Sequence, residues 1–221
     1  MRLVERMKEL DSGMVARVGT KRSNTVRMTG AVCTANFLLG TGKLCMGLLS
    51  ASFFTVMNAL YTYGMVAAKL CVLKGVAVPA PKQYAYCRKA AGILLAASLF
   101  YALYSARLLL HSEKAQYHPY LAMGIATVIF TEIGLNLWGV WVERKKKSPL
   151  FHTLKIINLA SSLIGLVLTQ TAILSFTHTE AEYDASRSNA ILGLCMGGCA
   201  ALLGWFLLWR TARLEREEKT Q

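Results

Sequence analysis

Long uninterrupted apolar runs constrain this chain more than any other feature. Four runs are clear in the sequence: 90–110, 120–142, 156–176 and 190–209. At 1.5 Å rise per residue, a helix of about 20 residues crosses the roughly 30 Å hydrocarbon core of a bilayer. A backbone that faces lipid must satisfy its own hydrogen bonds, and the alternating pattern of membrane β-strands is absent. The runs therefore predict an all-α fold, a polytopic membrane helical bundle.

A further apolar stretch, 28–70, is too long for one span and fits two. Its residues 28–68 hold a single charged side chain, that of Lys43. We divide the stretch at a tight turn near Ser50, and one long span is the alternative. The division predicts six transmembrane helices, at about 30–49, 51–70, 88–110, 120–142, 152–176 and 190–209.

Basic residues gather at one set of predicted helix ends. Segments 1–27, 69–89, 144–147 and 210–219 are rich in Lys and Arg, whereas the other connections hold few. With six helices all the basic segments fall on one side, which the positive-inside rule makes cytoplasmic. With five helices the basic N-terminal segment would lie outside. Four tryptophans fall toward the same helix ends, as an aromatic belt predicts: Trp138, Trp141, Trp205 and Trp209.

The chain divides into three predicted parts. Residues 1–29 form a basic cytoplasmic segment, 30–209 the bundle and 210–221 a charged cytoplasmic tail. The first ten residues suit either a helix on anionic lipid or a solvated tail. We expect no signal peptide, because residues 1–27 lack an apolar core. The predicted location is the plasma membrane of a bacterium, with both termini cytoplasmic.

Two connections carry local signals. Residues 78–81 read Val-Pro-Ala-Pro, which predicts an extended linker because proline disfavours helix in the residue before it. Ser148 and Pro149 offer an N-cap and a first-turn proline, so the fifth helix should begin before its apolar run.

Composition narrows the chemistry. The formal net charge is +13, but the basic runs flank helices, which favours anionic lipid head groups over nucleic acid as partners. The six cysteines suit reduced thiols rather than a disulfide framework. No nucleophile triad, metal-ligand spacing or cofactor signature stands out, and Gly40-Thr41-Gly42-Lys43 lacks the phosphate-loop arrangement. Enzyme chemistry therefore has little support.

Glu132 is the one carboxylate deep within a predicted span. Because an acidic charge at the centre of a membrane helix costs about 2.5–3.5 kcal/mol, this side chain should be protonated or paired. Asn136 lies one turn further along the same face. The pair could be part of a proton or cation site, or a structural hydrogen-bonding group, and the residues alone favour neither.

Amides and hydroxyls mark two other helices. Asn58 and Thr62 stand one turn apart on one face of the second predicted helix. Asn158 and Ser162 occupy the inner half of the fifth. These groups should face the bundle interior, where they either line a small-ion site or fix helix packing.

Two basic side chains are also embedded. Arg107 lies about one turn from the outer end of its helix and can snorkel, whereas Lys43 lies about two turns in. Arg107 and Glu132 differ in depth by roughly 10 Å, too far for a direct pair. Gln170 matches Arg107 in depth, so the two could line an outer vestibule.

Gly193 and Gly197 form a G-x-x-x-G face on the last helix, which permits close approach of another helix. Packing within the bundle is the preferred interpretation, and dimerisation is the alternative.

The polar and glycine pattern resembles one known family. Asn36-x3-Gly40-x2-Lys43-x3-Gly47-x2-Ser50, followed by Asn58-Ala59-x2-Thr62, resembles the first two helices of cation diffusion facilitators. Asn158-Leu159-Ala160-Ser161-Ser162 is similar to their fifth helix. The resemblance covers roughly residues 30–176, and it implies a six-helix divalent-metal transporter with cytoplasmic termini.

The chain departs from that family at the transport site. The family uses two Asp residues on the second helix, and a His or Asp followed by an Asp on the fifth. The matching positions here hold neutral side chains: Asn58, Thr62, Leu154 and Asn158. Neutral groups cannot supply the charge that holds zinc or manganese. We also expect no cytoplasmic C-terminal domain, because the tail is short.

Two functional hypotheses follow. The first is a diverged transporter that moves an ion or small solute through a pocket of Glu132 and amides. The second is a relative that transports nothing and serves as a membrane scaffold or accessory subunit. Its partner would be a membrane subunit or a second copy of the chain. A membrane enzyme that acts on lipid is a distant third.

Overall fold

The computed structural model describes residues 20–76, 78–110, 119–143, 148–177 and 185–219. Within these ranges every element is helical, which confirms the predicted all-α fold. The six helices, whose labels start at α2, are α2 (Thr20–Leu49), α3 (Phe53–Val76), α4 (Ala80–Leu110), α5 (Pro119–Glu143), α6 (Pro149–Thr177) and α7 (Ala185–Lys219).

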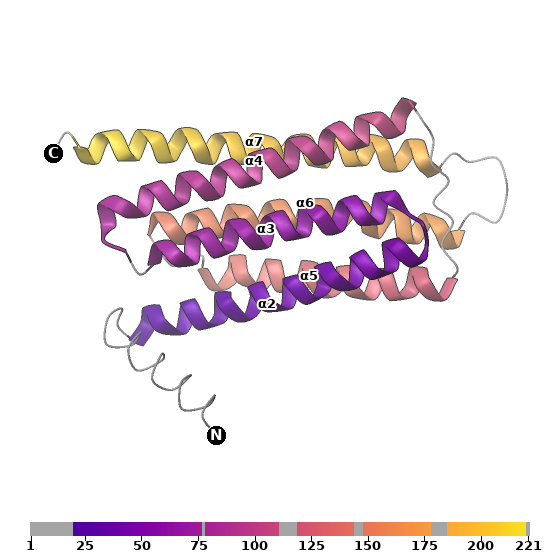
Figure 1. The fold of residues 1–221 in the computed structure, drawn as a ribbon, viewed down its shortest axis with the longest axis horizontal. Coiled ribbons are helices and arrows are strands. Elements are labelled where there is room, and N and C mark those ends of the chain that lie inside the picture. The colour runs from indigo at the N-terminus through magenta and orange to yellow at the C-terminus, as the bar shows by residue number, and fades with distance from the viewer. Residues whose placement is uncertain (1–19, 77, 111–118, 144–147, 178–184, 220–221) are drawn as a thin grey trace, which may run out of the picture.

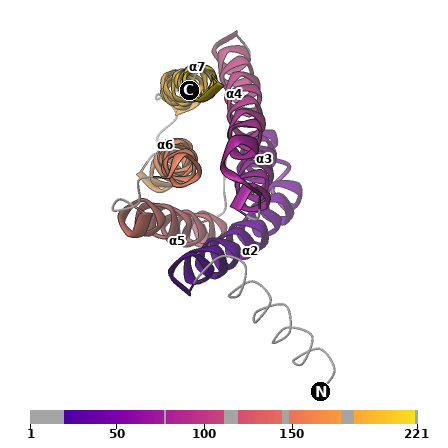
Figure 2. The ribbon, with the colours of Figure 1, turned by 90° about the vertical axis from the view of Figure 1, so that its left-hand side faces the viewer.

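The helices form two layers of three (Figures 1 and 2). One layer holds α2, α3 and α4, and the other holds α5, α6 and α7. Across the layers α2 packs on α5, α3 on α6 and α4 on α7, and the last of these contacts is the most extensive. Each cross-layer pair is antiparallel, because the chain reverses direction at every connection (Figure 1).

Five helices contain stretches long and apolar enough to cross a bilayer: Thr29–Leu49, Phe53–Val76, Lys82–Leu110, Pro149–Thr171 and Arg187–Glu217. In α5 the qualifying apolar part of the described residues is shorter, Ala126–Trp138. Every helix also exposes large apolar side chains, such as Leu38, Leu103 and Leu202. An apolar surface on all helices suits lipid as the solvent. The chain is a multi-pass membrane protein.

A tight turn separates α2 from α3 at the predicted position. Ala51 takes a left-handed conformation, with φ of 50°. The N–H of Ser52 donates to the carbonyl of Gly47 at 2.9 Å, and the N–H of Ala51 donates to that of Leu48 at 3.3 Å. This pair of bonds is a Schellman motif, which satisfies the last carbonyls of the helix. The stretch 28–70 is therefore two helices rather than one.

Helix ends extend beyond the apolar runs. The predicted linker at residues 78–81 is wrong in its second half, because α4 begins at Ala80. Pro81 lies in the first helical turn, where a missing N–H costs no intrahelical bond. α6 begins at Pro149, the position that Ser148 and Pro149 predict. Polar residues at these ends kept the sequence-based bounds too short.

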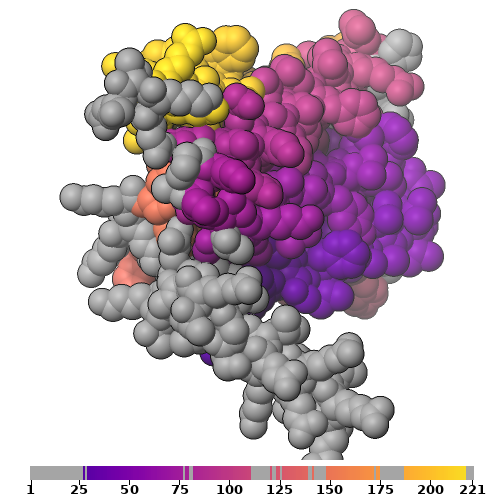
Figure 3. Space-filling view, turned by 60° about the vertical axis from the view of Figure 1, so that its left-hand side comes forward, coloured from indigo at the N-terminus to yellow at the C-terminus, as the bar shows by residue number. Residues whose placement is uncertain are grey.

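The two layers meet in a packed core. One cluster of buried side chains joins α3, α4, α6 and α7 and includes Met65, Leu94, Ile157 and Leu207. Tyr101 of α4 packs its ring against Phe54 and Tyr61 of α3. The space-filling view shows α2, α3 and α4 as one continuous surface with α7 along its edge (Figure 3).

Candidate functional site

A buried polar stripe runs along the inner face of α2. Asn36, Gly40, Lys43 and Gly47 all turn inward. Their spacings of four, three and four residues keep them on one face of a helix. The side chain of Lys43 is 1% exposed, which is unusual for a lysine. Its ammonium must therefore find its partners inside the bundle.

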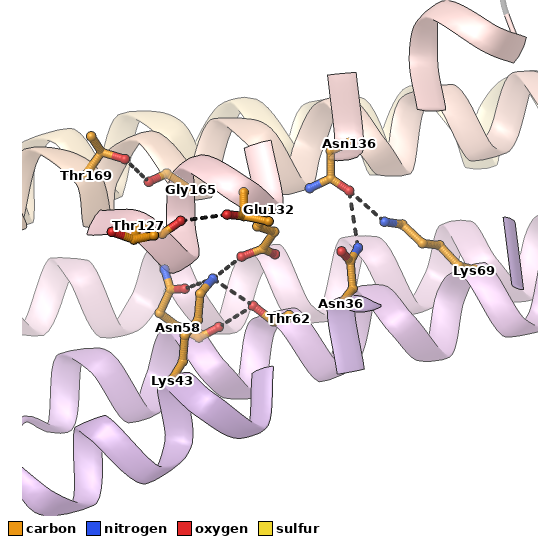
Figure 4. Close-up of polar contacts among 11 residues, drawn as sticks. Asn36, Lys43, Asn58, Thr62, Lys69, Thr127, Glu132, Asn136, Gly165 and Thr169 are labelled. Atoms are coloured by element: carbon orange, nitrogen blue, oxygen red, sulfur yellow. Dashed lines mark hydrogen bonds and ion pairs between the residues drawn. The ribbon is translucent and has the colours of Figure 1, made fainter. Parts of the chain in front are cut away.

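Three helices supply those partners (Figure 4). Lys43 Nζ forms an ion pair with the carboxylate of Glu132 on α5. From α3, Asn58 Oδ1 accepts a hydrogen bond from Nζ at 3.1 Å, and Thr62 Oγ1 accepts another at 3.4 Å. All three acceptors are buried. The ammonium thus lies at the junction of α2, α3 and α5.

The hydroxyl of Thr62 is held in the acceptor role. Its own hydrogen is donated to the backbone carbonyl of Asn58 at 3.0 Å. A hydroxyl has one hydrogen and two lone pairs, so a lone pair is left for Lys43. The one-turn spacing of Asn58 and Thr62 places both acceptors on the same side of α3.

A second polar group lies on the same three helices (Figure 4). Asn136 Oδ1 on α5 accepts from Lys69 Nζ of α3 at 2.8 Å and from Asn36 Nδ2 of α2 at 3.2 Å. Lys69 and Asn136 are each fully buried. We call the two groups together the polar seam: Asn36, Lys43, Asn58, Thr62, Lys69, Glu132 and Asn136.

The two levels of the polar seam differ in depth. Asn136 and Lys69 each lie seven residues from the end of their helices, or about 10 Å along the axis. Glu132 lies eleven residues from the same end of α5, or about 16 Å. The charged pair therefore occupies the deeper level, where the cost of a lone charge is greatest.

Electrostatics decides what this site can hold. A buried ion pair does not by itself add stability, but removal of one partner leaves an expensive uncompensated charge. Around Lys43 one carboxylate, that of Glu132, faces one ammonium, so the pair has no net charge. A divalent cation placed here would meet a positive neighbour and a single carboxylate. Lys43 therefore excludes metal cations from the position it occupies.

The structure brings some of the predicted site residues together. Asn58, Thr62 and Glu132 meet around Lys43, and Asn136 lies one turn from Glu132 in the adjacent group. The ion-pair partner of Glu132 is Lys43 of α2. The sequence comparison of depths excluded Arg107 as the partner but did not point to Lys43.

The other predicted residues lie elsewhere. Asn158 and Ser162 are buried on α6, where Ser162 Oγ donates to the backbone carbonyl of Asn158 at 3.1 Å. Asn158 Oδ1 has no hydrogen-bond partner among the described residues. Arg107 is exposed and Gln170 is half-buried. Neither α6 nor this outer pair contributes a hydrogen bond to Lys43 within the described ranges.

Gly193 and Gly197 face α4 inside the bundle. A Cβ added at Gly193 would come 2.5 Å from Ser105 Oγ, and one at Gly197 would come 3.2 Å from backbone atoms of Ala102. Gly204 continues the contact, with Leu95 backbone atoms 3.0 Å from its added Cβ. We call this contact the glycine seam: Gly193, Gly197 and Gly204 of α7 against Leu95, Ala102 and Ser105 of α4.

Sequence reasoning missed the roles of the two buried lysines. Lys43 and Asn36 stand seven residues apart, as do Lys69 and Thr62, so each pair shares a helix face. That spacing was a usable signal for Lys69. The assignment of each ammonium to its acceptor required knowledge of which helices are neighbours, which one sequence does not supply.

Among the residues described, no group of three or more His, Cys, Asp or Glu side chains could hold a metal ion. The six cysteines are all free.

Compared with known proteins, the chain matches no family model, and no curated protein is significantly similar to it in sequence.

Proposed function

We propose that this chain is a six-span membrane protein whose central site is filled by its own Lys43, and that it serves as a scaffold or accessory subunit rather than a cation carrier. One observation carries the proposal: Lys43 Nζ is bound by Glu132, Asn58 and Thr62 at a buried junction of three helices. An ammonium fixed at this point supplies the positive charge that a bound cation would supply. Because it is part of the chain, it cannot be transported.

Six spans are supported by length and by the position of the basic segments. α5 has 25 residues and is about 37 Å long, enough to cross a bilayer even though its strongly apolar part is shorter. The start of α2, the facing ends of α3 and α4, the facing ends of α5 and α6, and the end of α7 lie at one end of the bundle (Figure 1). These are the ends rich in Lys and Arg, so we place them in the cytoplasm.

The basic end also supports anionic lipid as a partner. Lys74, Lys82 and Arg210 are exposed there. The four tryptophans at this end are exposed as well, and indole rings favour the head-group level. A bacterial plasma membrane, with both termini cytoplasmic, fits this arrangement.

A relation to cation diffusion facilitators is part of the proposal. Asn58 and Thr62, at the positions where that family carries its two Asp residues, are the α3 residues that bind Lys43. A site that has lost its carboxylates and gained a tethered ammonium is what a non-transporting relative would need. This relation rests on the residues of the seam and on the six-helix topology.

The test is ion flux in proteoliposomes that contain the purified chain. We expect zinc, manganese and proton fluxes equal to those of empty liposomes, both for the native chain and for Glu132→Gln. A flux of the native chain that falls in Glu132→Gln, but not in the exposed control Glu217→Gln, would overturn the proposal. The scaffold role predicts in addition that a membrane protein co-purifies with the native chain at fixed stoichiometry.

A second candidate is a carrier that moves a proton or small solute by way of Glu132. It is favoured by the location of the ion pair, which joins α2 and α5 across the two layers. Protonation of Glu132 would release Lys43 and loosen that contact. Flux dependent on Glu132 would select this function over the scaffold.

A further inference from the structure

We propose that Asn58, Thr62 and Glu132 form a binding site for a primary ammonium group, and that Lys43 fills it as an intramolecular ligand. The inference deepens the proposed function and rests on it for the native role of the site. We call the three acceptors the ammonium cradle. Its ligand class is ammonium itself and small unbranched alkylammonium ions.

The number of acceptors matches the number of donors. A primary ammonium carries three N–H bonds and no acceptor. The cradle offers three oxygens to Lys43 Nζ: one from the Glu132 carboxylate, Asn58 Oδ1 at 3.1 Å and Thr62 Oγ1 at 3.4 Å. Each N–H of the ammonium therefore has one acceptor inside the bundle.

The hydroxyl of Thr62 is oriented for the ligand by a hydrogen bond within its own helix. Thr62 gives its hydrogen to the Asn58 carbonyl, which leaves a lone pair for the ligand. Both α3 acceptors sit within the helix that frames the site, and all three groups are buried. An acceptor that is already oriented binds a cation without the cost of ordering it.

Charge selects the ligand class. The cradle holds one carboxylate, which balances one positive charge. Structural zinc sites take four nitrogen or sulfur ligands, and calcium takes six or more oxygens. Two neutral oxygens and one carboxylate meet neither requirement. A monovalent ion that donates three directional hydrogen bonds matches both the single negative charge and the three acceptors of the ammonium cradle.

Lys43→Ala tests the site directly. The substitution keeps Cβ and removes a three-carbon chain that ends in the ammonium, which is the size of n-propylammonium. We expect n-propylammonium chloride to raise the Tm of the full-length variant saturably, by about 2–4 °C at several times its dissociation constant. Sodium chloride, tetramethylammonium chloride and n-propanol at equal concentration should not do so.

Two matched chains complete the design. The native chain, with its cradle filled, and Lys43→Ala/Glu132→Gln, with the carboxylate removed, should show no saturable shift with n-propylammonium. An equal shift in the double variant, or no saturable shift in Lys43→Ala, would overturn the inference. Flux is not measured here, so a native chain that carries ions would refute the proposed function without affecting this result.

Lys43→Ala can fail to fold, and a second readout covers that case. The yield of monodisperse protein is then compared after extraction with n-propylammonium or with tetramethylammonium. A yield restored by n-propylammonium alone supports the cradle. Equal recovery with both ions, or recovery with neither, contradicts it.

Discussion

The polar seam and the glycine seam hold the same bundle together by different means. At the glycine seam, small residues let α7 approach the α4 backbone, so that dispersion contacts stabilise the packing of the two helices. At the polar seam, α2, α3 and α5 are joined through two buried ammonium groups, a carboxylate and amides. A well-packed apolar contact of equal volume would stabilise as well as a buried ion pair or better. The polar seam is therefore the part of the fold that calls for a functional explanation.

The largest expected effect is at the deeper level of the polar seam. Glu132→Gln removes the negative partner and leaves Lys43 as a buried lone charge. We expect a loss of about 3–5 kcal/mol in the free energy of unfolding. Reversible unfolding in mixed micelles measures it, with the loss of helical signal as the readout. A loss below 1 kcal/mol would mean that the pair is not buried from water.

A smaller effect is expected at the shallower level of the polar seam. Asn136→Leu keeps the branching of the side chain at Cγ but removes the acceptor shared by Lys69 and Asn36. Because hydrogen bonds to charged groups contribute about 1.5–3 kcal/mol, we expect a loss in that range from the same unfolding measurement. Asn136→Asp is the matched control, since it keeps both hydrogen bonds and adds a charge opposite Lys69. Equal losses in the two variants would show that the acceptor is not what matters.

The glycine seam should respond to volume and not to charge. Gly204→Ala places a methyl 3.0 Å from backbone atoms of Leu95, and backbone cannot move aside cheaply. We expect a loss of about 1–3 kcal/mol in unfolding free energy, as for other overpacked contacts. Gly198→Ala is the control, because nothing lies within 4 Å of its added Cβ. It should be neutral or stabilising by up to about 1 kcal/mol, and a larger loss there would contradict the packing account.

The smallest effect is expected outside both seams. Arg88 of α4 and Glu215 of α7 form an ion pair at 3.1 Å, with the arginine side chain 55% and the glutamate side chain 19% exposed. Surface pairs contribute about 0–1 kcal/mol, so Glu215→Gln should change the unfolding free energy by less than about 1 kcal/mol. The change should shrink further in high salt. A larger, salt-independent loss would place this pair in a drier environment than its exposure indicates.

The sequence predicted the local features of the polar seam but not its contacts between helices. The turn near Ser50 follows from the length of the apolar stretch 28–70, and the shared face of Asn36, Lys43 and Gly47 follows from helical spacing. Both are local information. Glu132 stood out because a charge in an apolar run is rare. Its partner could not be assigned, since Lys43 is 89 residues away along the chain and the sequence does not show that α2 and α5 are neighbours. Helix ends were placed too far inward, because polar first and last turns carry no hydropathy signal.

The most direct test of the central claim is a double-mutant cycle on Lys43 and Glu132. Unfolding free energies are measured for the native chain, Lys43→Met, Glu132→Gln and the double variant. The cycle isolates the interaction between the two side chains from their separate effects. We predict a coupling of about 2 kcal/mol or more, with the double variant more stable than Glu132→Gln alone. Additive losses, with a coupling near zero, would show that Lys43 and Glu132 do not pair in the membrane and would refute the self-filled site.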